Sequence, residues 1–145
     1  MQRLIAIRGV RTFIAALLTF ITILALPTPR TADARTRSEV RTGFCAIDWR
    51  RGDAAVRRLI RCAEQRWSVP GGTAKAIDVA RCESGFEPDA YSSGNAGVYQ
   101  HATRYWPGRA QSFGFRGWSV YNGRANVIVT MRMVHRMGWD AWSCA

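Results

Sequence analysis

The sequence predicts a small, mainly α-helical single domain that carries two disulfides. Three observations support this class: four segments repeat apolar residues at helical spacing with few strand signals, four cysteines lie between residues 44 and 145, and no Pro-, Gly- or Ser-rich linker divides that region. The domain is therefore placed at residues 44–145, a length within the range of about 50–250 residues that is usual for one domain.

The first 34 residues have the pattern of a secretory signal peptide. Arginines precede an apolar run at residues 13–26, and Ala32 and Ala34 supply small residues for cleavage. A membrane anchor is the weaker alternative, because a spanning helix needs about 20 apolar residues and this run is shorter. We expect residues 1–34 to be a signal peptide, residues 35–43 to be a flexible leader, and the domain to be secreted.

A first helix is predicted at residues 54–67, with Asp53 as its cap. Its apolar residues fall on one face: Val56, Leu59, Ile60 and Ala63. After a turn, Thr73 caps a second helix that stops at Gly85, because glycine readily takes the left-handed conformation that ends many helices. Glu83 therefore lies in the last turn of this second helix.

The second half of the domain begins with a predicted loop at residues 87–97, which is rich in Gly, Ser, Asn and Asp. Residues 98–100 form a short extended segment after it. Pro107 opens a short helix. Asn122 caps a last helix at residues 123–137, which has a broad apolar face.

The cysteines of the domain are even in number, which in a small exported chain indicates disulfides. They are Cys45, Cys62, Cys82 and Cys144. Spacing alone leaves all three pairings open. A zinc site is the alternative, but there is no Cys-x-x-Cys pair and neither His101 nor His135 has ligand-like spacing to a cysteine. We expect no metal and no organic cofactor.

The chain is strongly basic, with a net charge of +11. Residues 1–34 hold four arginines and one aspartate, so the remainder keeps +8 (11 less 3). Such a protein is attracted to polyanions, and an exported protein meets the acidic polymers of a bacterial wall first. Nucleic acid is the other polyanion, but no nucleic-acid-binding motif is present, so we expect none as a partner.

Glu83 is the candidate catalytic residue. The carboxyl end of a helix carries partial negative charge, and apolar neighbours disfavour an ionised carboxylate, so both effects raise the pKa of Glu83. A raised carboxyl pKa suits a general acid at neutral pH. Position alone favours a solvated glutamate at a helix end, and only the surrounding motifs favour the catalytic interpretation.

These motifs resemble those of the soluble lytic transglycosylases. A Glu-Ser pair ends a helix in that family and a Gly-Leu-(Phe/Met)-Gln motif follows a short loop, as Glu83-Ser84 and Gly97-Val98-Tyr99-Gln100 do here. Cys82-Glu83-Ser84-Gly85 and the late Trp142 and Cys144 also resemble resuscitation-promoting factors, small secreted members of the same lysozyme-like superfamily. The resemblance covers about residues 73–144, and Asn126-Val127 matches the start of the family's following helix.

The resemblance implies a lysozyme-like fold that cleaves the glycan strands of peptidoglycan with Glu83 as acid. Ser84 and Gln100 would bind sugar or orient Glu83. Tyr91 and Tyr99 would line the cleft, with partial packing in the core as the equal alternative for these two side chains. The bonded pairs would be Cys82–Cys144 and Cys45–Cys62. We expect a monomer at the cell wall, without stable membrane insertion once the signal peptide is removed.

Three alternatives stay open. Glu87 or Asp89 would make the enzyme a hydrolytic muramidase by holding a water, because glycosidases usually employ two carboxylates. A non-catalytic wall-binding module is the second, since the late Ala-Tyr-Asn-Ala-Gly element of longer transglycosylases has no counterpart after the last helix. A basic antimicrobial or nucleic-acid-binding protein is the third.

Overall fold

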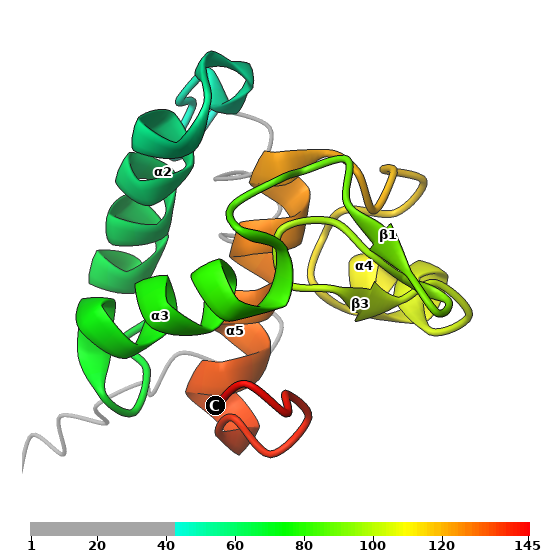
Figure 1. Ribbon diagram of the computed structural model, residues 1–145. Coiled ribbons are helices and arrows are strands. Elements are labelled where there is room, and N and C mark those ends of the chain that lie inside the picture. The colour runs from blue at the N-terminus through cyan, green and yellow to red at the C-terminus, as the bar shows by residue number, and fades with distance from the viewer. Residues whose placement is uncertain (1–42) are drawn as a thin grey trace, which may run out of the picture.

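The computed structural model describes residues 43–145, which form one small, mainly helical domain with a short sheet (Figure 1). The predicted signal peptide and all but the last residue of the predicted leader lie outside these residues. None of the helices within residues 43–145 combines the length and the apolar character of a membrane span.

All four predicted helices are present, with ends that shift by a few residues. In chain order the elements are the 3-10 helix η1 (Trp49–Arg51), the helices α2 (Asp53–Arg66) and α3 (Gly72–Ser84), the strands β1 (Tyr91–Ser92), β2 (Asn95–Ala96) and β3 (His101–Ala102), and the helices α4 (Trp106–Ser112) and α5 (Gly123–Met137). The mainly α prediction is therefore confirmed.

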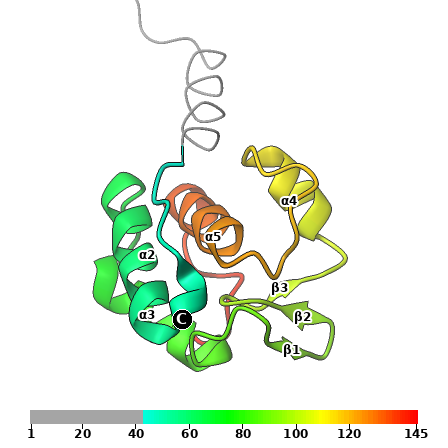
Figure 2. The same ribbon diagram turned by 90° about the horizontal axis from the view of Figure 1, so that it is seen from above.

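Helix α5 is the centre of the domain. It runs between α2 and α3 on one side and the sheet with α4 on the other (Figures 1 and 2). Every residue from Gly123 to Val134 is buried, although its sequence pattern indicated only one broad apolar face. The polar residues within that stretch are consequently held by specific hydrogen bonds, which organise the candidate site.

The helix starts differ in detail from the predicted caps. Gly52 rather than Asp53 precedes α2, and Gly71 in the left-handed conformation precedes α3. The Thr73 hydroxyl instead donates to the Glu64 carboxylate at 2.8 Å and so links the two helices. The predicted Asn122 cap is confirmed, because its side-chain oxygen accepts from the backbone N–H of the third residue of α5 at 3.0 Å.

The predicted loop contains an antiparallel sheet in the order β1-β2-β3. Tyr91 pairs with Ala96, and Ala96 pairs with His101. Each strand has two residues, which is too short for a period-two pattern to appear in the sequence. The extended segment predicted at residues 98–100 is wrong, because these residues form a turn between β2 and β3.

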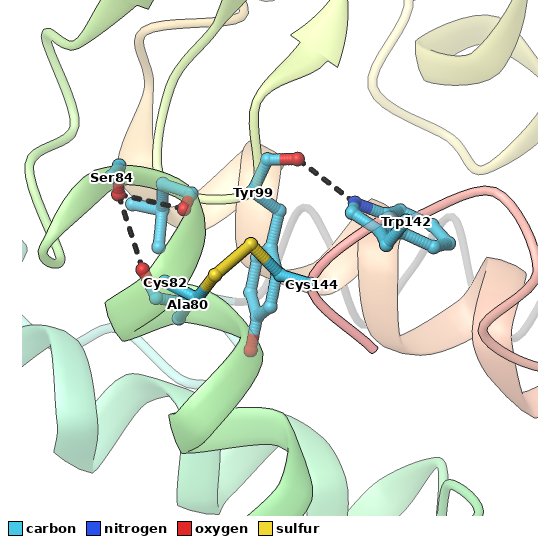
Figure 3. Close-up of a disulfide and its surroundings, with 7 residues drawn as sticks. Ala80, Cys82, Ser84, Tyr99, Trp142 and Cys144 are labelled. Carbon is cyan, nitrogen blue, oxygen red and sulfur yellow. Dashed lines mark hydrogen bonds between the residues drawn. A yellow bond between two sulfur atoms is a disulfide. The ribbon is translucent and has the colours of Figure 1, made fainter.

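The prediction of two disulfides is confirmed, and the pairing is the one that the resemblance implies. Cys45–Cys62 fastens the start of the described chain to α2, and Cys82–Cys144 fastens the end of α3 to the C-terminal tail (Figure 3). Residues 43–145 contain no free cysteine.

Candidate functional site

Glu83 lies in the last turn of α3, as predicted. The helix ends at Gly85, whose φ of 62° places it in the left-handed region and whose backbone N–H donates to the Arg81 carbonyl at 2.9 Å. This cap turns the chain away from the helix axis immediately after Glu83 and Ser84. The Glu83 side chain is consequently half-buried between the helix end and the C-terminal tail.

Burial raises the pKa of the Glu83 carboxyl above its ordinary value. A hydrogen bond from the backbone N–H of Cys144 acts in the opposite direction and offsets part of that rise. The raised pKa favours the protonated form, which is the form a general acid requires. The donor belongs to the residue that is disulfide-bonded to Cys82, so the covalent bond keeps this N–H beside the carboxyl.

Ser84 connects the helix end to the turn after β2. Its hydroxyl donates to the Val98 carbonyl at 2.8 Å and also lies 3.4 Å from the Ala80 carbonyl (Figure 3). The single hydroxyl hydrogen is therefore used within the protein. Of the two roles expected for Ser84, orienting the region around Glu83 fits this geometry, whereas donating to a sugar does not.

Tyr99 does not line a cleft, contrary to the prediction. Its side chain is fully buried and its hydroxyl donates to the Ala76 carbonyl at 2.9 Å. The backbone carbonyl of Tyr99 accepts from the Trp142 indole N–H at 2.9 Å, which ties the turn to the C-terminal tail (Figure 3). Its place in the motif reflects packing against α3 and the tail, because no part of the ring reaches the surface.

Gln100 follows in the left-handed conformation, with a φ of 43° that is uncommon for a residue other than glycine. Its side-chain amide nitrogen donates to the Gly97 carbonyl at 2.9 Å and to the Ala90 carbonyl at 3.2 Å. Both amide hydrogens are thus used, and the amide oxygen remains to accept from a ligand. Tyr91 lies on the edge strand β1 with 63% of its surface exposed, and its hydroxyl has no hydrogen bond within residues 43–145.

The Asn126 side chain on α5 hydrogen-bonds to the backbone of the turn between β2 and β3. Its amide oxygen accepts from the Tyr99 backbone N–H at 2.9 Å, and its nitrogen donates to the carbonyls of Val120 at 2.9 Å and Ala96 at 3.3 Å. Gly97 is required here, since a Cβ at this residue would collide with the Asn126 amide and lie 2.6 Å from the Val120 carbonyl oxygen. The glycine of the motif is thereby explained by the close approach of the Asn126 side chain and the Val120 backbone.

A buried polar chain supports Asn126 and was not expected from the sequence. Arg109 donates to Nδ1 of His101 at 2.9 Å, because a guanidinium can only donate. Nε2 of His101 must then carry the proton that it shares with the Thr130 hydroxyl at 2.8 Å, and Thr130 donates to the Asn126 carbonyl at 2.9 Å. Burial and the charge of Arg109 lower the pKa of His101 to about 3.

A cavity of about 590 Å³ lies beside the site, and Glu83, Ser84 and Gln100 are not among its lining residues. Three segments of the chain form it: Trp49, Arg50 and Gly52; Glu87, Pro88 and Asp89; and Ser119, Tyr121 and Asn122. Both candidates for a second carboxylate therefore face this cavity. No group of three or more His, Cys, Asp or Glu side chains suited to a metal occurs within residues 43–145.

Comparison with protein-family models, with curated proteins and with solved structures finds no match for this chain.

Proposed function

We propose that this protein is a secreted peptidoglycan lytic transglycosylase of the lysozyme-like fold, with Glu83 as its general acid and base. The main observation that supports this proposal is the half-buried Glu83 carboxyl at the end of α3, whose pKa is raised by burial. The Glu-Ser and Gly…Gln motifs around it are brought together by the Ser84–Val98 hydrogen bond, which joins the helix end to the Gln100 turn.

The proposed reaction has two steps, and Glu83 donates a proton in the first and takes one back in the second. Protonated Glu83 gives its proton to the glycosidic oxygen, and the bond from that oxygen to C1 of the muramic acid breaks. The C6 hydroxyl of the same muramic acid then bonds to C1 while the Glu83 carboxylate takes the hydroxyl proton. The product is a 1,6-anhydro sugar, Glu83 is again protonated, and no water is consumed.

The position of the other carboxylates favours this route over hydrolysis. A hydrolase with two carboxylates needs the second one to hold a water at the reacting bond. Glu87 and Asp89 line a cavity that Glu83 does not line. The Glu83 carboxyl accepts a hydrogen bond from the backbone N–H of Cys144. Within residues 43–145, no second carboxylate interacts with it.

Secretion to the wall belongs to the same proposal. Two disulfides are typical of proteins that function in an oxidising compartment. The net charge of +8 that remains after residue 34 favours attraction to the acidic polymers of a wall.

The test is mass spectrometry of the fragments that the protein releases from purified peptidoglycan. We expect anhydro-muramyl ends from the wild type and none from Glu83→Gln. Glu64→Gln is the matched control, because its amide oxygen can still accept from the Thr73 hydroxyl, and it should retain the wild-type fragments. Fragments with reducing ends would instead indicate a hydrolase. If the folded wild type releases no fragments from several types of wall, the protein is a binding module.

A further inference from the structure

The cavity of about 590 Å³ is not used by the chemistry at Glu83. Its volume lies within the range of about 300–1,000 Å³ that is usual for ligand sites. Its lining comes from η1 and the following Gly52, from the loop after α3 and from the segment before α5, so it exists only in the folded chain. Its side chains include one cation and two carboxylates, which points to a ligand that carries charge.

Trp49 forms a rigid part of the wall. A Cβ on Gly123 would lie 2.9 Å from the indole, so the first residue of α5 must be glycine for the ring to rest there. The Arg50 guanidinium lies over the same indole, 4.2 Å from the ring centroid. The exposed Arg50 guanidinium therefore covers aromatic surface that a sugar ring would need for stacking, and Arg50 is itself a lining residue of the cavity.

The charged groups of the cavity have unused binding capacity. The exposed Glu87 and Asp89 carboxylates have no hydrogen bond or ion pair within residues 43–145. The guanidinium of Arg50 likewise stacks on Trp49 without a carboxylate partner in the same residues. A ligand with an ammonium group and a carboxylate complements this set, because charged hydrogen bonds are stronger than those to sugar hydroxyls.

We propose that the cavity binds a short peptide carrying a side-chain ammonium and a carboxylate, with Glu87 and Asp89 receiving the ammonium and Arg50 the carboxylate. The inference that this peptide is the stem attached to the glycan rests on the proposed function. Glu87 is four residues after Glu83, so their Cα atoms lie at most about 14 Å apart. On this proposal, the peptide of one wall repeat unit lies at the cavity while its glycan lies at Glu83.

The experiment measures peptide binding to the full chain, expressed for export, in the Glu83→Gln background so that turnover is absent. The probe is acetyl-Ala-γ-D-Glu-Lys, and the Trp49 indole N–H resonance reports the cavity. We expect saturable shifts of this resonance, and at least tenfold weaker binding when the lysine ammonium is acetylated. The double variant Glu87→Gln, Asp89→Asn should bind the unmodified peptide more weakly by a similar factor.

Arg50→Gln should also weaken binding at least tenfold, whereas Arg58→Gln, an exposed arginine of α2 outside the cavity, should leave it unchanged. Near-ultraviolet circular dichroism establishes that each variant is folded. The proposal is overturned if the acetylated and free peptides bind equally, if the peptide does not bind, or if only tetra-N-acetylchitotetraose shifts Trp49. If the wild type binds the peptide but releases no wall fragments, the proposed enzymatic activity is refuted and the proposed peptide site is supported.

Discussion

His101 should make the stability of the domain depend on pH, and replacing it with glutamine should remove that dependence. The imidazole is fully buried, with Trp106 and Trp142 against it at ring-centroid distances of 5.2 and 5.7 Å. It must accept the Arg109 hydrogen through Nδ1, so a second proton on the ring has no acceptor. Burial is the larger cause of its low pKa, and the Arg109 charge adds to it.

The magnitude follows from the two pKa values. A pKa of about 3 in the folded chain against 6.5 in the unfolded one corresponds to about 5 kcal/mol, since each tenfold change in proton affinity is worth about 1.4 kcal/mol. Because the folded-state pKa is the lower one, this stability is fully present above pH 6.5 and is lost as the pH falls toward 3. Between pH 6.5 and pH 4 the expected loss is about 3 kcal/mol.

The assay is urea unfolding followed by tryptophan fluorescence at pH 7 and pH 4. His101→Gln can retain both hydrogen bonds, because its amide oxygen can accept from Arg109 and its nitrogen can donate to Thr130. Its unfolding free energy should fall about 3 kcal/mol less than that of the wild type. The control is His135→Gln, which replaces the exposed second histidine and leaves the Arg109–His101–Thr130 hydrogen bonds in place. Equal pH dependence in His101→Gln and the wild type would refute the argument.

Two further predictions concern the turn and the tail, and both are measured by urea unfolding at pH 7. Gly94→Ala should cost about 1–2 kcal/mol for its left-handed conformation alone, since a Cβ there meets nothing within 4 Å, whereas Gly97→Ala should cost about 1–3 kcal/mol more because of the collision with Asn126. Equal costs would contradict the close approach. Cys144→Ser opens a ring with a sequence separation of 62 and should cost about 4 kcal/mol, against about 3 kcal/mol for Cys45→Ser with a separation of 17. The reverse order would contradict the chain-entropy reasoning.

The helices and the place of Glu83 could be predicted because local rules determine them. The apolar spacing of α2, the Asn122 cap of α5 and the glycine after α3 each act within a few residues. The Tyr99 prediction was wrong for the opposite reason: a motif indicates which residues occur together but not which side chain faces the core. Its burial depends on α3 and the tail, 23 and 43 residues away in the hydrogen bonds that hold it.

The cavity and the polar chain behind the turn could not be predicted for a related reason. Arg109, His101 and Thr130 are separated by 8 and 29 residues, and no spacing rule connects a short helix, a strand and the middle of a long helix. Three segments far apart in the sequence likewise line the cavity. In each case the residue types were visible, whereas their proximity is a property of how α5 packs against the rest of the domain.

These contacts also indicate how the motif works. Ser84 from α3, Asn126 from α5 and Trp142 from the tail all hydrogen-bond to the backbone of residues 96–99. The turn that carries Gln100 is therefore held by three elements, so its position relative to Glu83 is set before any ligand binds. Most motif residues then serve to position the backbone, and few remain to contact a ligand. On the proposed function, selectivity for the wall comes from groups outside the motif, and the proposed peptide site at the charged cavity supplies such groups.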